Sequence, residues 1–273
     1  MQRKNGTLSS TVLEALRNRK NRPDGKQISS PSSPSGTLVA SYNVHKCIGV
    51  DRRFDPERTA RVIQEIGADV IALQEADQRF GERAGLLDLA HLERETGLVS
   101  VGAGGFPKAH GWHGNVVLVR QGVVRDLHPV TLPGLEPRGA VVVEIDLKQG
   151  GSLRIIAAHL GLLRRSRAQQ LHTIIELMKS RDETPTLLLG DLNEWRLGDR
   201  SSLNTLHPAF GHMPPAVPSF PSGLPLLALD RIIANRQGLI SSFQTHDTPL
   251  ARLASDHLPV KAVVDLQQAE TAA

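Results

Sequence analysis

The segment Pro185-Thr186-Leu187-Leu188-Leu189-Gly190-Asp191-Leu192-Asn193 joins a short apolar run to polar residues. Its three leucines predict a buried strand over 185–189. Asp191 and Asn193 then follow the end of that strand, which is where functional sites form on α/β scaffolds. The segment therefore predicts both a strand of the core and one part of a site.

Five further apolar segments carry polar residues at or near one end in the same way. These residues are Asn43 and His45 for 38–44, Gln74 and Glu75 for 69–73, His159 for 153–159, Asp230 for 229–234, and Asp256 with His257 for 257–264. Two more strands are predicted over 115–120 and 139–147. We expect the polar residues to meet at one edge of the fold.

Helices are predicted between the strands, over 56–66, 86–96 and 167–179. The first has the clearest signals, with Asp55 as N-cap, Pro56 in the first turn and Gly67 at its end. Residues 209–227 are rich in proline and predict a long loop near a functional face. Long strands interspersed with helices predict an α/β chain.

The two ends of the chain differ from its middle. Residues 1–36 are polar and finish with Ser-Ser-Pro-Ser-Ser-Pro-Ser-Gly, a composition that buries little apolar surface. We expect a disordered or loosely packed tail there. One catalytic domain is expected over 37–268, followed by a C-terminal tail over 269–273.

Composition limits the class of protein. Of the 273 residues, 40% are hydrophobic, which is enough for one large domain. No apolar run reaches the roughly 18 residues of a membrane span, and the basic start does not resemble a secretory signal. The single cysteine, Cys47, excludes an internal disulfide framework and is expected to be a buried bystander. A cytoplasmic location is the resulting expectation.

The charge balance bears on the partner. A net charge of +4 favours a polyanionic partner, such as nucleic acid or an anionic lipid surface. The alternative is a basic protein whose charge has no role in binding. Aromatic residues are only 3% of the chain, too few for a platform that stacks single-stranded bases. Arg164, Arg165 and Arg167 are expected to form a solvated face at a helix start, with a phosphate or membrane contact as the alternative.

The polar residues at the strand ends share one chemistry. Carboxylate and amide oxygens are hard ligands that suit Mg²⁺ or Mn²⁺ and not Zn²⁺. The candidate ligands are Asn43, Glu75, Asp191, Asn193 and Asp256. Because a histidine side chain ordinarily titrates near neutral pH, His257 is a candidate base for water, with Asp230 to hold its tautomer. This set predicts a metal-dependent phosphoester hydrolase.

Six sequence blocks also carry a family resemblance. They are Ser-Tyr-Asn-Val-His (41–45), Ile-Ala-Leu-Gln-Glu (71–75), Ile-Ile-Ala-Ala-His (155–159), Gly-Asp-Leu-Asn (190–193), Leu-Asp-Arg-Ile (229–232) and Ser-Asp-His-Leu-Pro (255–259). In this order they resemble the endonuclease/exonuclease/phosphatase superfamily, and most closely its compact bacterial, deoxyribonuclease- or sphingomyelinase-like members. The resemblance implies a four-layer αββα sandwich, in which two packed mixed sheets are flanked by helices.

The resemblance also implies a metal site. Glu75 would be the principal ligand of Mg²⁺ or Mn²⁺, with Asn43 beside it. Asp256 would contact the metal directly or through water. Whether one or two ions bind is left open by the sequence.

Roles in the reaction follow from the same resemblance. Asp191 would orient or deprotonate the attacking water, and Asn193 would position the phosphate. His159 would donate a hydrogen bond to the phosphate in the transition state. His257, oriented by Asp230, would be a base or a phosphate contact, so the base is either Asp191 or His257.

Three further residues are expected near the substrate. Arg138 matches a phosphate-contacting arginine of the deoxyribonuclease branch. His45 stands where abasic-site enzymes carry an aspartate, and His113 is the nearest polar residue to a tyrosine that those enzymes have. Both departures argue against abasic-site activity.

Alternatives remain open for the residues and for the substrate. Asn43 and Asp191 could be turn formers after strands, His159 a core histidine, and Asp230 a structural partner of Arg231. DNA is the first substrate expectation, and a lipid or small phosphoester is the second. A non-catalytic binding module that kept the fold is the remaining alternative.

Overall fold

The computed structural model describes residues 36–102, 107–148, 150–196, 198–211 and 213–271. The expected N-terminal tail lies outside the described residues, apart from Gly36. No helix in the described ranges is both long enough and apolar enough to cross a membrane.

The strands of the described chain form two mixed sheets. In sheet order, the first contains β10 (Ile240–Thr245), β11 (Val260–Val264), β1 (Thr37–Asn43), β2 (Val70–Gln74), β4 (Val116–Val119) and β3 (Val99–Val101). The second contains β5 (Val123–Leu132), β6 (Arg138–Asp146), β7 (Ser152–His159), β8 (Thr186–Asp191) and β9 (Asp230–Ala234). The pairs β1/β2 and β7/β8 are parallel, and the other pairs are antiparallel.

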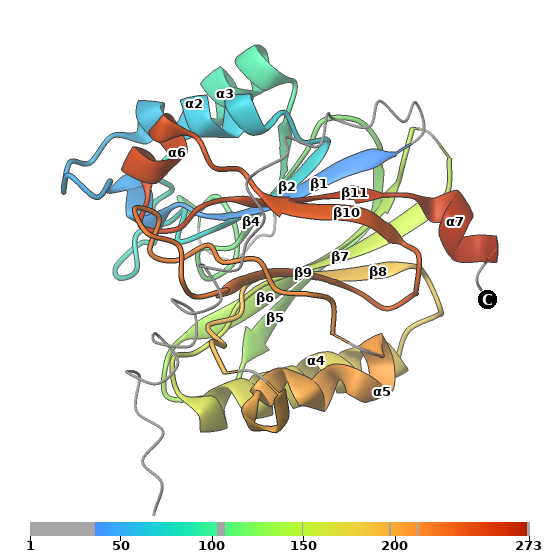
Figure 1. Ribbon diagram of the computed structural model, residues 1–273. Helices are drawn as coiled ribbons and strands as arrows, with labels where there is room; N and C mark the ends of the chain where they lie inside the picture. The colour runs from blue at the N-terminus through green and yellow to red at the C-terminus, as the bar shows by residue number, and fades with distance from the viewer. Residues whose placement is uncertain (1–35, 103–106, 149, 197, 212, 272–273) are drawn as a thin grey trace, which may run out of the picture.

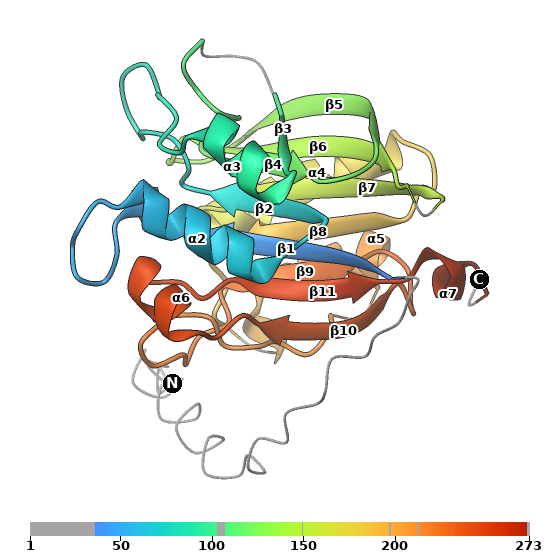
Figure 2. The same ribbon diagram turned by 90° about the horizontal axis from the view of Figure 1, so that it is seen from above.

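Helices cover the outer face of each sheet. Against the first sheet lie α2 (Pro56–Ile66), α3 (Leu89–Thr96) and α6 (Pro249–Ala254), and against the second lie α4 (Arg164–Lys179) and α5 (His207–Phe210) (Figure 1). Short 3₁₀ turns occur at His45–Cys47, Gly198–Arg200 and Ser202–Leu206. Seen from above, α2 and α3 run over the strands of the first sheet (Figure 2). The predicted four-layer αββα sandwich is confirmed.

Side-chain alternation explains why the strand sequences are almost wholly apolar. In β2, Val70 and Ala72 join the cluster between the two sheets, whereas Ile71 and Leu73 join the cluster under α2 and α3. A third cluster lies between the second sheet and α4. Because both faces of the central strands are buried, most of their positions select an apolar residue.

Local signals placed the helix α2 correctly. The Asp55 side chain accepts a hydrogen bond from the backbone N–H of Arg58 at 2.8 Å. Gly67 ends the helix with φ 65°, a left-handed conformation that glycine adopts without a Cβ penalty. Both ends of the helix are therefore fixed by the residues that predicted them.

Some elements were missed or had different bounds. β5 was not predicted because it is an edge strand with mostly exposed or half-exposed residues, so its apolar pattern is weak. The predicted strand over 257–264 begins only at Val260. Helix α7 (Leu266–Thr271) extends past residue 268 with Ala269 buried, so ordered structure continues into the expected C-terminal tail.

The expected solvated arginine face is wrong for one of its members. Arg167 is completely buried in α4, where it pairs with the buried Glu194 at 3.3 Å. Arg164 and Arg165, in the first turn, are exposed. The run of arginines at the helix start gave no sign of this buried ion pair, because the partner Glu194 comes later in the chain, after strand β8.

Candidate active site

The candidate site lies at one edge of the fold, where strand ends from the two sheets meet. β7 and β8 are parallel, so His159 at the end of β7 stands beside Asp191 at the end of β8. β9 runs antiparallel to β8, which places Asp230, its first residue, beside Asp191. Asn43 ends β1 in the other sheet, and its side-chain amide donates to Asp191 Oδ2 at 3.0 Å. This hydrogen bond joins the two halves of the site.

Asp230 and His257 form a buried pair. His257 Nδ1 donates to Asp230 Oδ2 at 2.8 Å, and Ser219 Oγ donates to the same oxygen at 2.5 Å. Asp230 is completely buried and His257 is 6% exposed. The pair fixes the ring orientation, so Nε2 of His257 is the nitrogen that is left for chemistry.

Asp191 is the centre of the polar cluster. Its Oδ2 lies 3.5 Å from His159 Nε2 and 3.8 Å from His257 Nε2, and its Oδ1 accepts from the backbone N–H of Asn193 at 3.0 Å. Gly190 precedes it with φ 142°, and a Cβ there would lie 1.8 Å from the carbonyl oxygen of Ala158. Only glycine fits at this close approach of β7 and β8.

Burial and neighbouring charge shift the ionisation of this cluster. Burial disfavours the charged form of His257, but the carboxylates of Asp230 and Asp191 outweigh it and raise the pKa of His257 to about 10. Burial also raises the pKa of Asp191, to about 6. The two groups face each other, so their protons belong to the pair and not to either residue alone.

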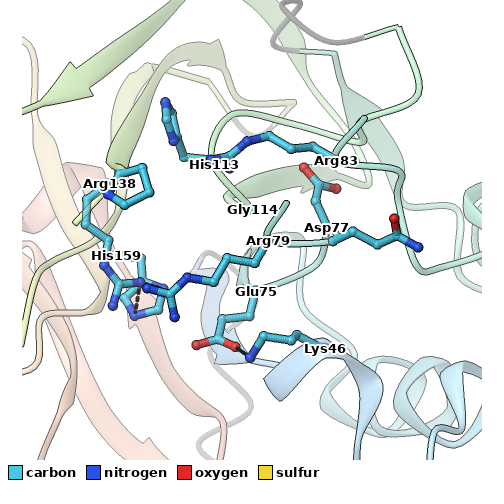
Figure 3. Close-up of a pocket in the computed structure, with 11 residues that line it drawn as sticks. Lys46, Glu75, Asp77, Arg79, Arg83, His113, Gly114, Arg138 and His159 are labelled. Carbon is cyan, nitrogen blue, oxygen red and sulfur yellow. Dashed lines mark hydrogen bonds and ion pairs between the residues drawn. The ribbon is translucent and has the colours of Figure 1, made fainter. Parts of the chain in front are cut away.

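Glu75 stands at the other side of the site. Its carboxylate forms an ion pair with the Lys46 ammonium (Figure 3). Burial acts to raise the pKa of Glu75, and the Lys46 charge outweighs burial and holds that pKa below its usual value. Glu75 and Lys46 both have left-handed backbone conformations, with φ 56°, and so does Asn193, with φ 52°. Such conformations cost free energy and are concentrated at functional sites.

Arg138 and His159 face the same pocket as Glu75 (Figure 3). Arg138 Nη1 lies 2.8 Å from His159 Nε2, and Arg138 Nη2 donates to Glu136 Oε2 at 2.8 Å. Burial and the nearby Arg138 charge hold the pKa of His159 well below its ordinary value. His159 is therefore neutral here, so one of its ring nitrogens donates a hydrogen bond and the other accepts one.

The remaining predicted residues lie around this centre. His113 lines the pocket with Arg138, as expected of a substrate neighbour. His45 Nδ1 donates to the carbonyl of Ile48 at 3.0 Å and lies 3.5 Å from Asp256, so its ring turns toward the protein. Asn193 is buried, and its side-chain amide donates to the Leu160 carbonyl at 2.9 Å.

The oxygen donors at the site fit a hard divalent cation. Glu75 and Asp256 keep 22% and 34% of their side chains exposed, so both carboxylates are reachable from solvent. Asp191, Asp230 and His257 also bring ligand atoms within 4.8 Å of one another. However, the bond from His257 to Asp230 already uses the Nδ1 nitrogen, so we interpret this buried trio as a proton-handling group. The available oxygens are those that Mg²⁺ or Mn²⁺ prefers.

Two contributors to the site were not predicted from the sequence. Lys46 was missed because its contact with Glu75 depends on the left-handed turn at His45–Cys47. Ser219 was missed because its bond to Asp230 depends on the loop that follows α5. A lysine directly after the Asn-Val-His segment was the signal available for the first.

The chain belongs to the endonuclease/exonuclease/phosphatase family, whose pattern it matches over residues 40–257. Members of this family are hydrolases that act on phosphoesters, and they generally use divalent metals. A search of the curated proteins found no match.

Solved structures share the fold. An endonuclease/exonuclease/phosphatase from Beutenbergia cavernae is 22% identical, with a TM-score of 0.64 over 85% of this chain and 72% of that one. A Bacteroides thetaiotaomicron mannosyl-6-phosphatase is 17% identical, with a TM-score of 0.60 over 84% and 99% of the two chains. D. rerio TDP2, complexed with a single-strand DNA product, is 15% identical, with a TM-score of 0.60 over 84% and 98%. At these identities the likeness shows the fold alone.

Proposed function

We propose that the chain is a phosphodiester hydrolase that depends on Mg²⁺ or Mn²⁺, with residues 37–268 as its catalytic domain. One observation carries the proposal. The buried Asp230–His257 pair points Nε2 of His257 toward Asp191, 3.8 Å away, at the junction of the two sheets. A histidine oriented by one carboxylate and facing another is an arrangement suited to moving a proton to or from water.

The Asp191–His257 pair handles the proton of the attacking water. Water forms a bond to phosphorus while the bond from phosphorus to the leaving oxygen breaks, and one proton passes from the water to this pair. Asp230 keeps Nδ1 of His257 protonated throughout, so any proton that His257 gives or takes passes through Nε2. With the pKa of His257 raised to about 10, the ring carries both of its protons near neutral pH, and Asp191 is the acceptor of the pair. Asn43 and the backbone N–H of Asn193 hold Asp191 in place.

The phosphate is recognised by groups from the second sheet. Arg138 supplies a fixed positive charge, and His159 beside it supplies a neutral N–H. Both face developing negative charge on the phosphate oxygens, where such donors contribute most to the rate. Glu75, Asn43 and Asp256 would hold the metal, which when bound neutralises phosphate charge and assists the leaving oxygen.

The substrate is the open part of the proposal. The D. rerio TDP2 structure contains a single-strand DNA product, and the Bacteroides protein is described as a mannosyl-6-phosphatase. The fold therefore serves both polymeric and small phosphoesters. DNA cleavage and small-ester cleavage are separate arms of the test.

The test is hydrolysis of bis-p-nitrophenyl phosphate beside supercoiled plasmid DNA, with Mg²⁺, with Mn²⁺ and with EDTA. We expect metal-dependent hydrolysis of the small diester that falls by about 10³-fold or more in His257→Ala. Glu75→Gln should lose metal-dependent turnover. His172→Ala and Glu176→Gln are the matched controls, since both residues are exposed on α4.

The outcomes separate the choices. Cleavage of both substrates favours a nuclease, and cleavage of the small diester alone favours a lipid or small-molecule phosphodiesterase. Glu75→Gln turnover equal to wild type would show that the metal assignment is wrong. If the protein binds a phosphodiester but hydrolyses none, the remaining alternative is a non-catalytic binding module.

A further inference from the structure

An apolar groove opens directly beside the catalytic pocket. Its walls include the side chains of Ile48, Phe54, Phe80 and Leu86, and its volume is about 470 Å³. Phe80 is 76% exposed and Phe54 is 58% exposed. Two large aromatic side chains that line one groove and remain exposed to water are typical of a binding surface.

The groove adjoins the pocket that holds Glu75, Arg138 and His159. Lys46, Gln78 and Arg79 line both cavities. Figure 3 shows Lys46 and Arg79 on the side of the catalytic pocket. A ligand that crosses this boundary has its polar part beside the charged residues and its apolar part against the apolar lining of the groove.

We propose that this groove binds the alkyl chain of an amphiphilic phosphoester whose phosphate lies in the catalytic pocket, an inference that rests on the proposed function. The order of chemistry along the two cavities matches such a molecule. The catalytic pocket supplies the cations Arg138, Arg79 and Lys46 for a phosphate. Beyond Lys46 and Arg79 the walls become almost wholly apolar.

An alkyl chain fits the groove better than a nucleobase does. A base needs hydrogen-bond partners for its edge in addition to a stacking surface, and Gln78 is the only neutral polar side chain that the described residues contribute to the groove. The Arg79 guanidinium already lies over the Phe80 ring, 5.7 Å from its centre. It therefore occupies part of the ring face on which a base would stack.

The test measures the binding of n-butyl, n-hexyl and n-octyl phosphate to the full-length protein with Mg²⁺, by isothermal titration calorimetry. A fully buried methylene strengthens binding about fourfold, and half burial in an open groove gives about twofold. We therefore expect n-octyl phosphate to bind about 16-fold more tightly than n-butyl phosphate, because the two differ by four methylenes. Thymidine 5′-phosphate serves as the nucleobase probe.

Variants locate the effect. Phe54→Ser and Phe80→Ser should each reduce the octyl-to-butyl ratio toward about fourfold or less. Val123→Ser, which removes an equally exposed apolar side chain from β5, should keep the wild-type ratio.

Each result has one meaning. A flat chain-length series in the wild type, an unchanged ratio in both phenylalanine variants, or tighter binding of thymidine 5′-phosphate than of n-octyl phosphate overturns the proposal. Failure of the proposed function would give a different result. The protein would not hydrolyse bis-p-nitrophenyl phosphate with metal, but its affinity for alkyl phosphates would still rise with chain length.

Discussion

Removal of the buried guanidinium of Arg167 should cost about 3 kcal/mol of stability. Arg167 is completely buried and donates to the carbonyls of Gly161 and Leu162, at 3.1 and 2.6 Å, and to Glu194, at 3.3 Å. Arg167→Met keeps most of the apolar stem and removes all of these donors. The main cost is the Glu194 carboxylate, which stays buried without its buried cation and keeps only the more exposed Arg196 guanidinium, 3.8 Å away.

The size of the effect follows from what Glu194 retains. Its carboxylate still accepts from the N–H and hydroxyl of Ser202, at 2.7 and 2.5 Å, and from the N–H of Arg196 at 2.9 Å. Breaking a buried pair costs about 3–5 kcal/mol, and these three donors place Arg167→Met at the lower end. For a domain of this size the melting temperature should fall by about 6–12 °C.

Urea unfolding followed by far-UV circular dichroism measures this cost. Tryptophan fluorescence is the wrong probe, because the Trp195 ring centre lies 5.1 Å from the Arg167 guanidinium and responds to the substitution directly. Arg165→Met is the matched control on the exposed first turn of α4 and should change stability by no more than about 0.5 kcal/mol. The double variant Arg167→Met, Glu194→Met should cost less than the sum of the single changes.

Two results would refute this reasoning. One is Arg167→Met with a stability within about 0.5 kcal/mol of wild type, which would mean that the charge is solvated in the native protein. The other is strict additivity in the double variant, which would mean that Arg167 and Glu194 do not depend on each other.

Three further predictions concern the site. Asp230→Asn should lower kcat on bis-p-nitrophenyl phosphate by about 10³-fold or more, because an amide no longer favours the required tautomer of His257. Circular dichroism should show that the fold is intact. A loss under tenfold would argue that the Asp230–His257 pair is structural. Lys46→Gln should strengthen Mn²⁺ binding about fivefold by calorimetry, because the ion pair that competes for Glu75 is gone. Cys47, whose pKa burial raises to about 11, should react with Ellman's reagent at pH 8 only after unfolding, and rapid native reaction would contradict its burial.

Much of the fold followed from the sequence because its signals are local. The leucines before Asp191 predicted β8, and Asp55 with Gly67 predicted both ends of α2. An edge strand such as β5 has no such signal, since half-exposed positions accept polar residues as readily as apolar ones. The two-sheet arrangement came from the family resemblance, and strand counting only permitted it.

The candidate site was predictable for residues at the strand ends and not for residues that reach it through loops. Asn43, His159 and Asp191 end β1, β7 and β8. Parallel pairing of β7 with β8 brings His159 beside Asp191, and the packing of the two sheets brings Asn43 to Asp191. Lys46 reaches Glu75 only through a left-handed turn, and the pairing of Arg167 with Glu194 depends on how α4 packs against the second sheet. No pattern along the chain encodes either contact.

The charge argument for DNA also changes once the charge is located. The first 35 residues contain seven lysines and arginines against two acidic residues, a net charge of +5, whereas the whole chain carries +4. The remaining 238 residues therefore carry a net charge of −1, and they include the family match and the whole candidate site. A long polyanion gains affinity from each cation along its path. The part of the chain that carries the site offers no such excess, so net charge does not favour DNA over a small or lipid phosphoester as the substrate.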